Sequence, residues 1–355
     1  MSAGRWWSRD GDRIRCDLCP RACTMMPGQR GFCYVRAATD DGIELATYGR
    51  SSGFCIDPIE KKPLAHFLPG SAVLSFGTAG CNLGCRFCQN WDISKARADD
   101  RLQATASPEA IARAARNAGC RSVAFTYNDP VIFAEYAIDT AQACHAEGVK
   151  TVAVTAGYVN EPARSELFGV LDAANIDLKA FTEPFYERLC FARLPEVLDT
   201  IEYAVTETDC WVELTTLLIP GENDSEAEID AMTAWIADRL GPDVPLHFTA
   251  FHPDFKLRDR PRTPLETLLR ARDLARRNGL HHVYCGNVHH EPSDTTSCPA
   301  CDTPLVVRDG YTLKRWNLAN GACPTCGTRL AGVFEDSPGT WGARRRVLSV
   351  GDEIA

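Results

Sequence analysis

The chain has 355 residues, of which 45% are apolar, 24% charged and 9% aromatic. These proportions are typical of globular proteins, and they exclude a disordered chain, a collagen-like repeat and a small disulfide-bonded scaffold. The formal net charge of -9 argues against nucleic acid and anionic membrane surfaces as partners.

Seventeen cysteines are the unusual part of the composition. The first 15 residues contain no apolar core of a secretory signal, and no run of about 18 apolar residues could span a membrane. We therefore expect a cytoplasmic protein, in which thiols stay reduced and clustered cysteines bind metals or act as redox groups. The clusters divide the chain into three predicted domains: a cysteine-rich N-terminal module (1–68), a central domain (69–285) and a C-terminal four-cysteine module (286–355).

The N-terminal module holds four cysteines in the pattern C-x2-C-x3-C-x9-C, namely Cys16, Cys19, Cys23 and Cys33. Four thiolates so close in sequence can close one metal site. The spacing leaves zinc and a second iron–sulfur cluster open, with zinc slightly favoured.

Apolar runs of strand length alternate with segments of helical period through the central domain. Ser107-Pro108, Ser225 and Thr263 indicate helix starts, because a hydroxyl side chain can cap the first turn. The alternation predicts βαβ units around a parallel sheet, either open and doubly wound or a complete or partial barrel. His282–Cys285 could add a seventh short strand. The six expected strands are Ala72–Phe76, Ser122–Thr126, Lys150–Thr155, Ala174–Lys179, Trp211–Leu218 and Leu246–Phe251.

A second cysteine cluster follows the first expected strand directly, with Cys81, Cys85 and Cys88 in the spacing C-x3-C-x2-C. Three thiolates from one loop can hold three irons of a [4Fe-4S] cluster and leave the fourth iron open to a substrate or cofactor. A structural zinc site is the alternative, but it needs a fourth ligand, and no cysteine or histidine follows nearby. The spacing therefore favours a cluster.

Polar residues gather at the carboxyl ends of other expected strands, where α/β folds collect their reactive groups. Tyr127, Asn128 and Asp129 follow the second strand, and His252 follows the sixth. Asp177 and Lys179 share one face of the fourth strand, although a parallel strand covered by helices should be apolar on both faces. Taken without further information, the turn and His252 could be plain loop residues, and Asp177 and Lys179 a structural ion pair.

The C-terminal module contains two C-x2-C pairs with 21 residues between them, formed by Cys298, Cys301, Cys323 and Cys326. Two such pairs are typical of a tetrahedral zinc ribbon. A thioredoxin-type redox pair is the alternative for either one. We predict structural zinc, although four thiolates also accept iron.

The cysteine loop, with Phe87 just before its last cysteine, resembles that of the radical S-adenosylmethionine (radical SAM) superfamily. The resemblance implies a partial (β/α)6 barrel in which Cys81, Cys85 and Cys88 bind a [4Fe-4S] cluster and Phe87 shields it. It also implies that the amino and carboxylate groups of S-adenosylmethionine chelate the open iron. Reductive cleavage of this cofactor would give a 5′-deoxyadenosyl radical that abstracts hydrogen from a substrate.

Two narrower resemblances bear on the cofactor and the partners. Asp129-Pro130, the Asp177-x-Lys179 pair and His252-Pro253 are similar to motifs of glycyl-radical activating enzymes, although Thr215 stands where those enzymes have an arginine. This likeness implies that Tyr127, Asn128, Asp129, Asp177, Lys179 and His252 contact S-adenosylmethionine. The chain also resembles the AmmeMemoRadiSam radical SAM proteins in four segments, Asp57–Leu64, Gln89–Trp91, Ile176–Phe181 and Phe251–Pro253. This second resemblance implies Memo-like and AMMECR-like partners.

We therefore expect a radical SAM enzyme that acts on an unidentified substrate. Because no flavin-binding fingerprint is visible, it should draw electrons from a low-potential donor of the flavodoxin or ferredoxin type. The alternatives are an activase that installs a glycyl radical on a partner protein and a non-catalytic metal-binding adaptor.

Overall fold

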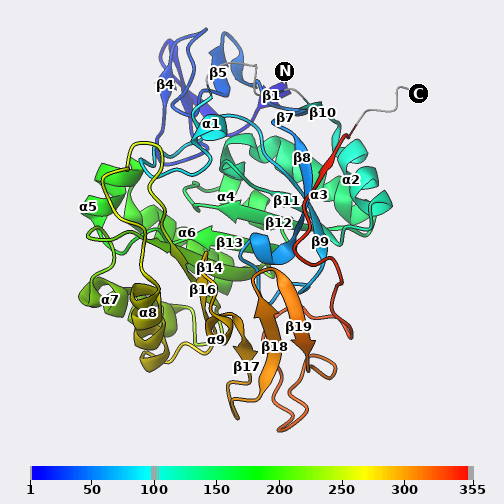
Figure 1. The fold of residues 1–355 in the computed structure, drawn as a ribbon. Coiled ribbons are helices and arrows are strands. Elements are labelled where there is room, and N and C mark those ends of the chain that lie inside the picture. Colours follow the sequence, from blue (N-terminus) through cyan, green and yellow to red (C-terminus); the bar gives the residue numbers. More distant parts are fainter. Residues whose placement is uncertain (1, 97–101, 103, 351–355) are drawn as a thin grey trace.

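The computed structural model describes residues 2–96, 102 and 104–350. Residues 351–355, the end of the predicted C-terminal module, lie outside the described residues. A nine-stranded sheet, counted over the described residues, forms the centre of the fold in the order β16-β15-β14-β13-β12-β11-β9-β8-β20 (Figure 1). Its strands are β8 (Phe54–Pro58), β9 (Ala72–Phe76), β11 (Ser122–Phe125), β12 (Lys150–Thr155), β13 (Ala173–Asp177), β14 (Trp211–Leu218), β15 (Leu246–Ala250), β16 (Val283–Gly286) and β20 (Arg346–Leu348).

Seven of these described strands, from β9 to β16, run parallel, so the mixed α/β fold with a large and mostly parallel sheet is confirmed. The count corrects the expected six, because the short segment after His282 pairs with β15 as a full neighbour. β8 and β20 add antiparallel strands beyond β9. The sheet stays open, since β16 and β20 form its two edges.

Helices connect the parallel strands and cover the outside of the sheet (Figure 1). Ser107 caps its helix by accepting a bond from the Ala110 amide, and Ser225 does the same for the Glu228 amide. The longer helices are α2 (Pro108–Asn117), α3 (Ala134–Ala146), α4 (Ala163–Phe168), α6 (Leu194–Thr206), α7 (Glu226–Arg239) and α8 (Leu265–Arg277), and the short ones are α1 (Trp91–Ser94), α5 (Glu183–Phe185), α9 (Glu291–Asp294), η1 (Ile59–Lys61), η3 (Pro130–Phe133) and η4 (Tyr186–Cys190).

The N-terminal region folds into small antiparallel sheets that pack against the central domain. The guanidinium of Arg36, only 1% exposed, bonds to the carboxylate of Glu135 on α3 at 2.8 Å. Ile14 and Leu45 belong to the same hydrophobic core as the parallel strands. The sheets are β1 (Ser2–Gly4) with β6 (Gly42–Leu45) and β5 (Arg36–Thr39), β2 (Trp7–Asp10) with β3 (Arg13–Cys16) and β4 (Thr24–Met25), and β7 (Arg50–Ser51) with β10 (Ala104–Thr105).

The C-terminal region carries the three-stranded sheet of β17 (Thr296–Ser297), β18 (Pro304–Asp309) and β19 (Thr312–Trp316). The β18–β19 hairpin lies near β16 in the view of Figure 1. Backbone bonds fix the region to the segment after η1, since Val333 donates to His66 at 2.7 Å and accepts from Leu68 at 2.8 Å.

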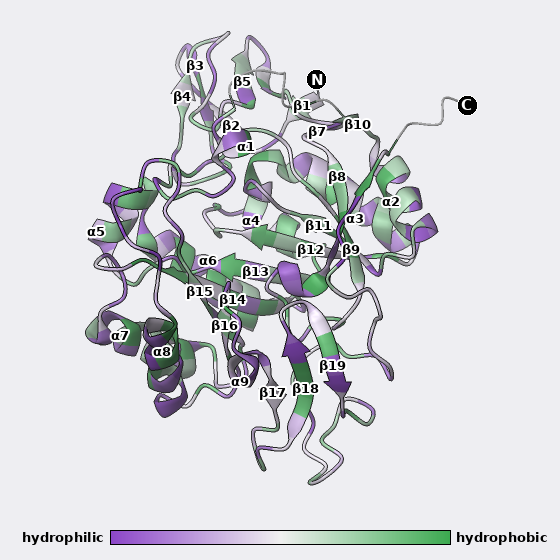
Figure 2. Ribbon diagram, in the orientation of Figure 1, coloured by the Kyte–Doolittle hydropathy of each residue, from purple (hydrophilic) through white to green (hydrophobic). Residues whose placement is uncertain are grey.

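Apolar residues concentrate on the strands of the central sheet, and polar residues on the outer helices and hairpins (Figure 2). This distribution follows from burying both faces of a parallel sheet. None of the helices in the described part of the chain has the length and apolar character needed to cross a lipid bilayer.

Candidate functional site

A cavity of about 870 Å³ opens at the carboxyl ends of the parallel strands. Ligand sites of α/β folds form at this edge, and the volume lies in the usual range for small-molecule sites. Of the nine residues predicted to bind the cluster or contact the cofactor, the structure brings eight to this one cavity. It is lined by Cys81, Cys85 and Cys88 and by Tyr127, Asn128, Asp129, Asp177 and Lys179.

The cysteine loop depends on close backbone contacts that only glycine permits. A Cβ at Gly77 would lie 2.4 Å from the Thr126 carbonyl oxygen, and one at Gly80 would lie 2.0 Å from the Cys33 carbonyl oxygen. Gly80 also has φ of +82°, a conformation that favours glycine. These contacts hold the start of the loop between the second parallel strand and the N-terminal region.

The middle of the loop rests on the π-helical turn η4. The Gly84 amide donates to the Cys190 carbonyl oxygen at 2.8 Å, and the Arg86 amide donates to the Leu189 carbonyl oxygen at 2.9 Å. The buried Cys190 thiol hydrogen-bonds to Cys85 and lowers the pKa of the Cys85 thiol. The sequence does not single out Cys190, because an isolated cysteine among apolar residues indicates an ordinary core position.

Two lysines place positive charge at the cysteine loop. Lys95 donates to the Leu83 carbonyl oxygen at 2.6 Å. Burial alone would lower the pKa of Lys179, but Asp177 and the Cys85 sulfur raise it well above its usual value, so Lys179 stays charged. Cations beside cysteine sulfurs favour the thiolate form, which is the form that binds metal.

Asn128 and Asp129 face the cavity, but their side chains already bond to the protein. Asn128 accepts from the Thr78 amide at 2.9 Å and donates to the Gly80 carbonyl oxygen at 3.0 Å. Asp129 accepts from the Thr155 hydroxyl and the Ala156 amide, both at 2.9 Å. Both side chains therefore fix the walls of the cavity, and the contact with S-adenosylmethionine expected of them stays a prediction.

Asp177 and Lys179 form an ion pair of 2.7 Å at the end of β13. The side chain of Lys179 is 14% exposed and that of Asp177 is 33% exposed, and both line the cavity. Lys179 bonds to one oxygen of Asp177. Because both side chains are also partly exposed at the cavity, a ligand there can contact the carboxylate and the ammonium group. Tyr186 supports this arrangement because its hydroxyl accepts from the Lys179 amide at 3.0 Å.

His252 lies apart from this set, exposed at the end of β15 and not among the residues that line the cavity. Its predicted contact with a cofactor stays a prediction. His247, which β15 turns inward, lines the cavity instead, and the buried Glu213 carboxylate lies 2.7 Å from its Nε2. The signal for His247 is the same as for Asp177, a polar residue within a buried parallel strand.

Asp57, Lys62 and Tyr127 make a further, largely buried cluster, and the sequence does not predict that the Asp57–Leu64 segment meets Tyr127. The Asp57 carboxylate accepts from Lys62 at 2.8 Å, from Lys61 at 3.0 Å and from the Tyr127 hydroxyl at 3.0 Å. Burial alone would raise the pKa of Asp57, but Lys62 and Lys61 lower it to about 2. The cluster explains how Tyr127 is held with φ of +71° at the cavity wall.

The three loop cysteines suit a [4Fe-4S] cluster. Burial raises the pKa of the Cys81 and Cys88 thiols, so a cationic group is needed to hold them as thiolates. Among the described residues, some groups have ligand atoms that all lie within 4.8 Å of one another, a spacing suited to a single ion. The three loop cysteines are not such a group. A cluster places each thiolate on a different iron, so its ligands stand further apart. Three thiolates and a large adjoining cavity therefore fit a cluster with one iron open to a cofactor.

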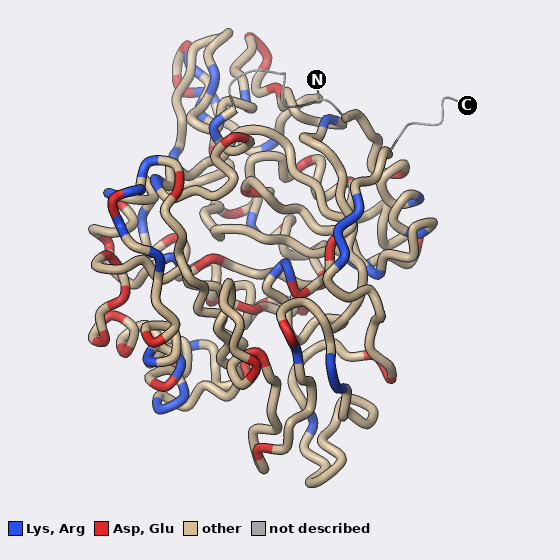
Figure 3. The backbone as a smooth tube through the Cα atoms, in the orientation of Figure 1, with Lys and Arg blue, Asp and Glu red and all other residues tan. Residues whose placement is uncertain are grey.

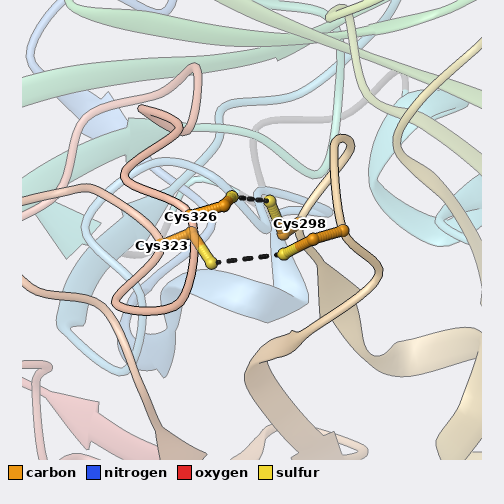
Figure 4. Close-up of side chains that lie close together, drawn as sticks. Cys298, Cys323 and Cys326 are labelled. Carbon is orange, nitrogen blue, oxygen red and sulfur yellow. Dashed lines mark hydrogen bonds between the residues drawn. The ribbon is translucent and has the colours of Figure 1, made fainter.

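The four C-terminal cysteines form a compact set of the kind that holds a single ion. The sulfurs of Cys298 and Cys326 lie 3.5 Å apart and those of Cys301 and Cys323 lie 3.6 Å apart (Figure 4). A tetrahedron of thiolates around zinc, with zinc–sulfur bonds of about 2.3 Å, spaces its sulfurs by about 3.8 Å. The geometry is thus consistent with a metal-binding module, and zinc as its metal stays a prediction.

The four N-terminal cysteines also come together, around a small cavity next to the cysteine loop. Cys16, Cys19, Cys23 and Cys33 line this cavity together with Asn82, the neighbour of Cys81. Arg21 joins the two regions by donating to the Asn82 carbonyl oxygen. This group of cysteines therefore lies against the cysteine loop, and the metal expected there stays a prediction.

Comparison with known proteins assigns the family. Residues 76–232 match the model of the radical SAM superfamily. The chain is 38% identical over 323 residues to the uncharacterized protein MJ0808 of Methanocaldococcus jannaschii. The aligned region covers 90% of this chain and 96% of that protein. It is 24% identical over 164 residues to the pyruvate formate-lyase 1-activating enzyme of Escherichia coli, over 44% of this chain and 65% of that enzyme.

Among solved structures, a radical SAM methyltransferase from Sphaerobacter thermophilus is similar with a TM-score of 0.49 and 19% identity, over 62% of this chain and 67% of that one. A domain of a pyruvate-formate lyase-activating enzyme from Bacteroides vulgatus gives a TM-score of 0.42 and 18% identity, over 47% of this chain and 99% of that one. The chain belongs to the radical SAM superfamily, as its cysteine loop predicts. Members of this superfamily are generally enzymes, and membership implies an iron–sulfur cluster and S-adenosylmethionine as cofactors.

Proposed function

We propose that this protein cleaves S-adenosylmethionine reductively at a [4Fe-4S] cluster held by Cys81, Cys85 and Cys88. The cofactor, when bound, supplies a 5′-deoxyadenosyl radical that abstracts a hydrogen atom from a substrate. The observation that supports this most is that the three cysteines and polar residues in or directly after five neighbouring parallel strands, β11 to β15, line one cavity.

The residues around the cavity have distinct parts in this proposal. Asp177 and Lys179 offer a carboxylate and an ammonium group to the polar parts of the cofactor, at a strand end close enough to Cys85 for their charges to act on its sulfur. Asn128 positions the cysteine loop through Thr78 and Gly80.

An electron donor of the flavodoxin or ferredoxin type would dock on a basic surface next to the cysteine loop. A surface hollow of about 440 Å³ lies beside Arg86, which is itself part of the loop. The hollow is lined by five basic residues and two acidic ones, although the whole chain is acidic. Figure 3 shows basic segments in the loop between β15 and α8, at the left of the view. The basic residues are Arg86, Arg188, Lys256, Arg258 and Arg260.

A second candidate function is that of a glycyl-radical activase, which the similarity to the Escherichia coli enzyme favours. A co-expressed partner protein would then acquire a radical in proportion to the deoxyadenosine formed. The likeness to AmmeMemoRadiSam proteins, with its Memo-like and AMMECR-like partners, stays a prediction.

The proposed cluster can be tested by electron paramagnetic resonance of the anaerobically reconstituted and reduced protein. We expect a reduced-cluster signal that changes when S-adenosylmethionine is added, because the cofactor binds the open iron. Cys85→Ala should lose the signal, whereas Cys120→Ala, at a buried cysteine that does not line the cavity, should keep it. A full signal in the Cys85 variant would exclude this ligand assignment.

A further inference from the structure

The cavity lining continues from the residues assigned to the cluster and its cofactor to the C-terminal region. It includes Thr215 of β14, the cross-strand neighbour of Asp177, together with Glu60 after β8, Tyr284 of β16 and residues 308–311 of the β18–β19 hairpin. The C-terminal region is therefore part of the cavity wall, and the cavity has room for a second ligand beside the cofactor.

The hairpin closes the side of the open sheet between β16 and the segment that follows η1. Arg308 on β18 donates to the Ala65 carbonyl oxygen at 2.6 Å, and Phe67 forms a parallel bridge with Val333. Further along, the Gly339 amide donates to the Pro69 carbonyl oxygen at 2.9 Å. A folded partner protein could insert a loop through this side only if these contacts separated.

Three residues of this part of the lining each carry a buried polar atom without a hydrogen-bond partner among the described residues. These atoms are Glu60 Oε2, Thr215 Oγ1 and Arg308 Nε. Such atoms are costly in a protein interior, and they are rare unless a ligand, ion or water completes them. All three residues line the same cavity, so one molecule could bond to all of them.

The remaining bonds of these residues fix their positions. Glu60 Oε1 accepts from the Gly70 amide at 2.6 Å. The guanidinium of Arg308 donates to neutral oxygens, those of Ala65, Thr296 and Asp294, and the carboxylates of Glu60 and Asp294 lie near enough to interact with its charge. An acceptor group of a ligand would suit Arg308 Nε, and a donor group would suit Glu60 Oε2.

We propose that Glu60, Thr215 and Arg308 form the substrate subsite, and that the substrate is a small polar molecule with a hydrogen-bond acceptor for Arg308 and a donor for Glu60. This inference rests on the proposed function, in that the subsite lies in the cavity assigned to the cofactor. It goes further by selecting a small molecule over a partner protein and by giving the C-terminal hairpin a direct part in the site.

The test is ligand retention, which does not require turnover. The reconstituted full-length protein with S-adenosylmethionine is mixed with the ultrafiltrate of a deproteinised cell extract, washed, and denatured, and the retained small molecules are identified by mass spectrometry. Thr215→Val removes the hydroxyl at nearly constant shape, and Glu60→Gln removes the charge. Ser122→Ala is the control, because Ser122 also has a buried hydroxyl without a partner but does not line the cavity.

We expect the wild type and Ser122→Ala to retain the same compounds. Thr215→Val and Glu60→Gln should retain about fivefold less, the loss expected for one hydrogen bond worth about 1 kcal/mol. Equal retention by all variants, or no compound retained by the wild type, would overturn the proposal. So would deoxyadenosine formation that rises with the macromolecular fraction of the extract and not with the ultrafiltrate. Deoxyadenosine formed by the wild type without extract reports separately on the proposed function.

Discussion

At the scale of single residues, the cysteine loop is shaped by its neighbours as much as by its three ligands. Gly84 stands between Cys81 and Cys85, and a Cβ there would lie 2.8 to 3.0 Å from ring and Cβ atoms of Phe191. Phe191 has a left-handed backbone at the end of η4 and is 50% exposed. Its ring therefore limits what the loop can carry at position 84.

Gly84→Ala should displace the cysteine loop and lower the iron bound per chain several-fold, because an overpacked contact costs about 1 to 3 kcal/mol. The double variant Gly84→Ala with Phe191→Ala should regain the iron, since it removes the clashing ring. Iron and sulfide analysis after anaerobic reconstitution measures both. If the double variant binds no more iron than the single one, the clash is not the cause.

Local spacing makes some site residues predictable and leaves others hidden. Cys81, Cys85 and Cys88 can be recognised because all three ligands come from one loop. His247 and Cys190 reach the site through β15 and η4, and only the fold brings them close. The strand-end rule selects Asp177 correctly for the cavity lining, but it also selects His252, which the chain turns outward after β15.

At the scale of elements, polar caps and apolar runs predict most of the central domain. Ser107 and Ser225 cap helices as expected. Thr263 does not, because Pro264 precedes the first residue of α8 and the Thr263 hydroxyl donates to the Leu218 carbonyl oxygen at 2.6 Å. β16 is too short for its pattern to distinguish a strand from a loop, and pairing with β15 decides it.

His282, the residue just before β16, makes the free energy of unfolding depend on pH. Burial lowers the pKa of His282 to about 4, below the usual value of 6.5, so the folded protein holds this ring neutral. The resulting stability is fully present above about pH 6.5 and is lost as the pH falls toward 4. Between about pH 8 and about pH 5.5, His282 alone should remove about 1.4 kcal/mol from the free energy of unfolding.

His282→Gln should therefore lose less stability than the wild type over this pH range, as measured by urea unfolding at both pH values. His281→Gln, at the exposed neighbouring position, serves as the control for the loss of a histidine. An equal loss in the wild type and His282→Gln would show that His282 is not the group responsible.

At the scale of the whole molecule, three parts of the chain meet around one cavity. The N-terminal region contacts the cysteine loop through Cys33 and Arg21, and the C-terminal hairpin forms the opposite wall. Cysteine spacing predicts metal sites in both flanking regions. It does not predict that these regions complete the central site, because that depends on contacts between segments far apart in sequence.

The basic surface beside Arg86 leads to a prediction about electron transfer. Reversing two charges in Arg86→Glu with Lys256→Glu should slow reduction of the cluster by a flavodoxin about tenfold, because opposite charges steer the encounter of the two proteins. Reduction by dithionite should change little. Arg113→Glu, on the exposed face of α2, is the matched control. Stopped-flow absorbance at several salt concentrations measures the rates, and equal rates for the double variant and the control would rule out docking at this surface.

The most direct test of the central claim is to quantify 5′-deoxyadenosine after anaerobic reconstitution with iron and sulfide and the addition of dithionite and S-adenosylmethionine. We predict formation by the wild type and by Cys120→Ala, and none by Cys88→Ala. Formation that persists in Cys88→Ala would contradict the assignment of the cluster to this loop. Absence of product from a wild-type protein that carries a reduced cluster would contradict cleavage of S-adenosylmethionine by this chain.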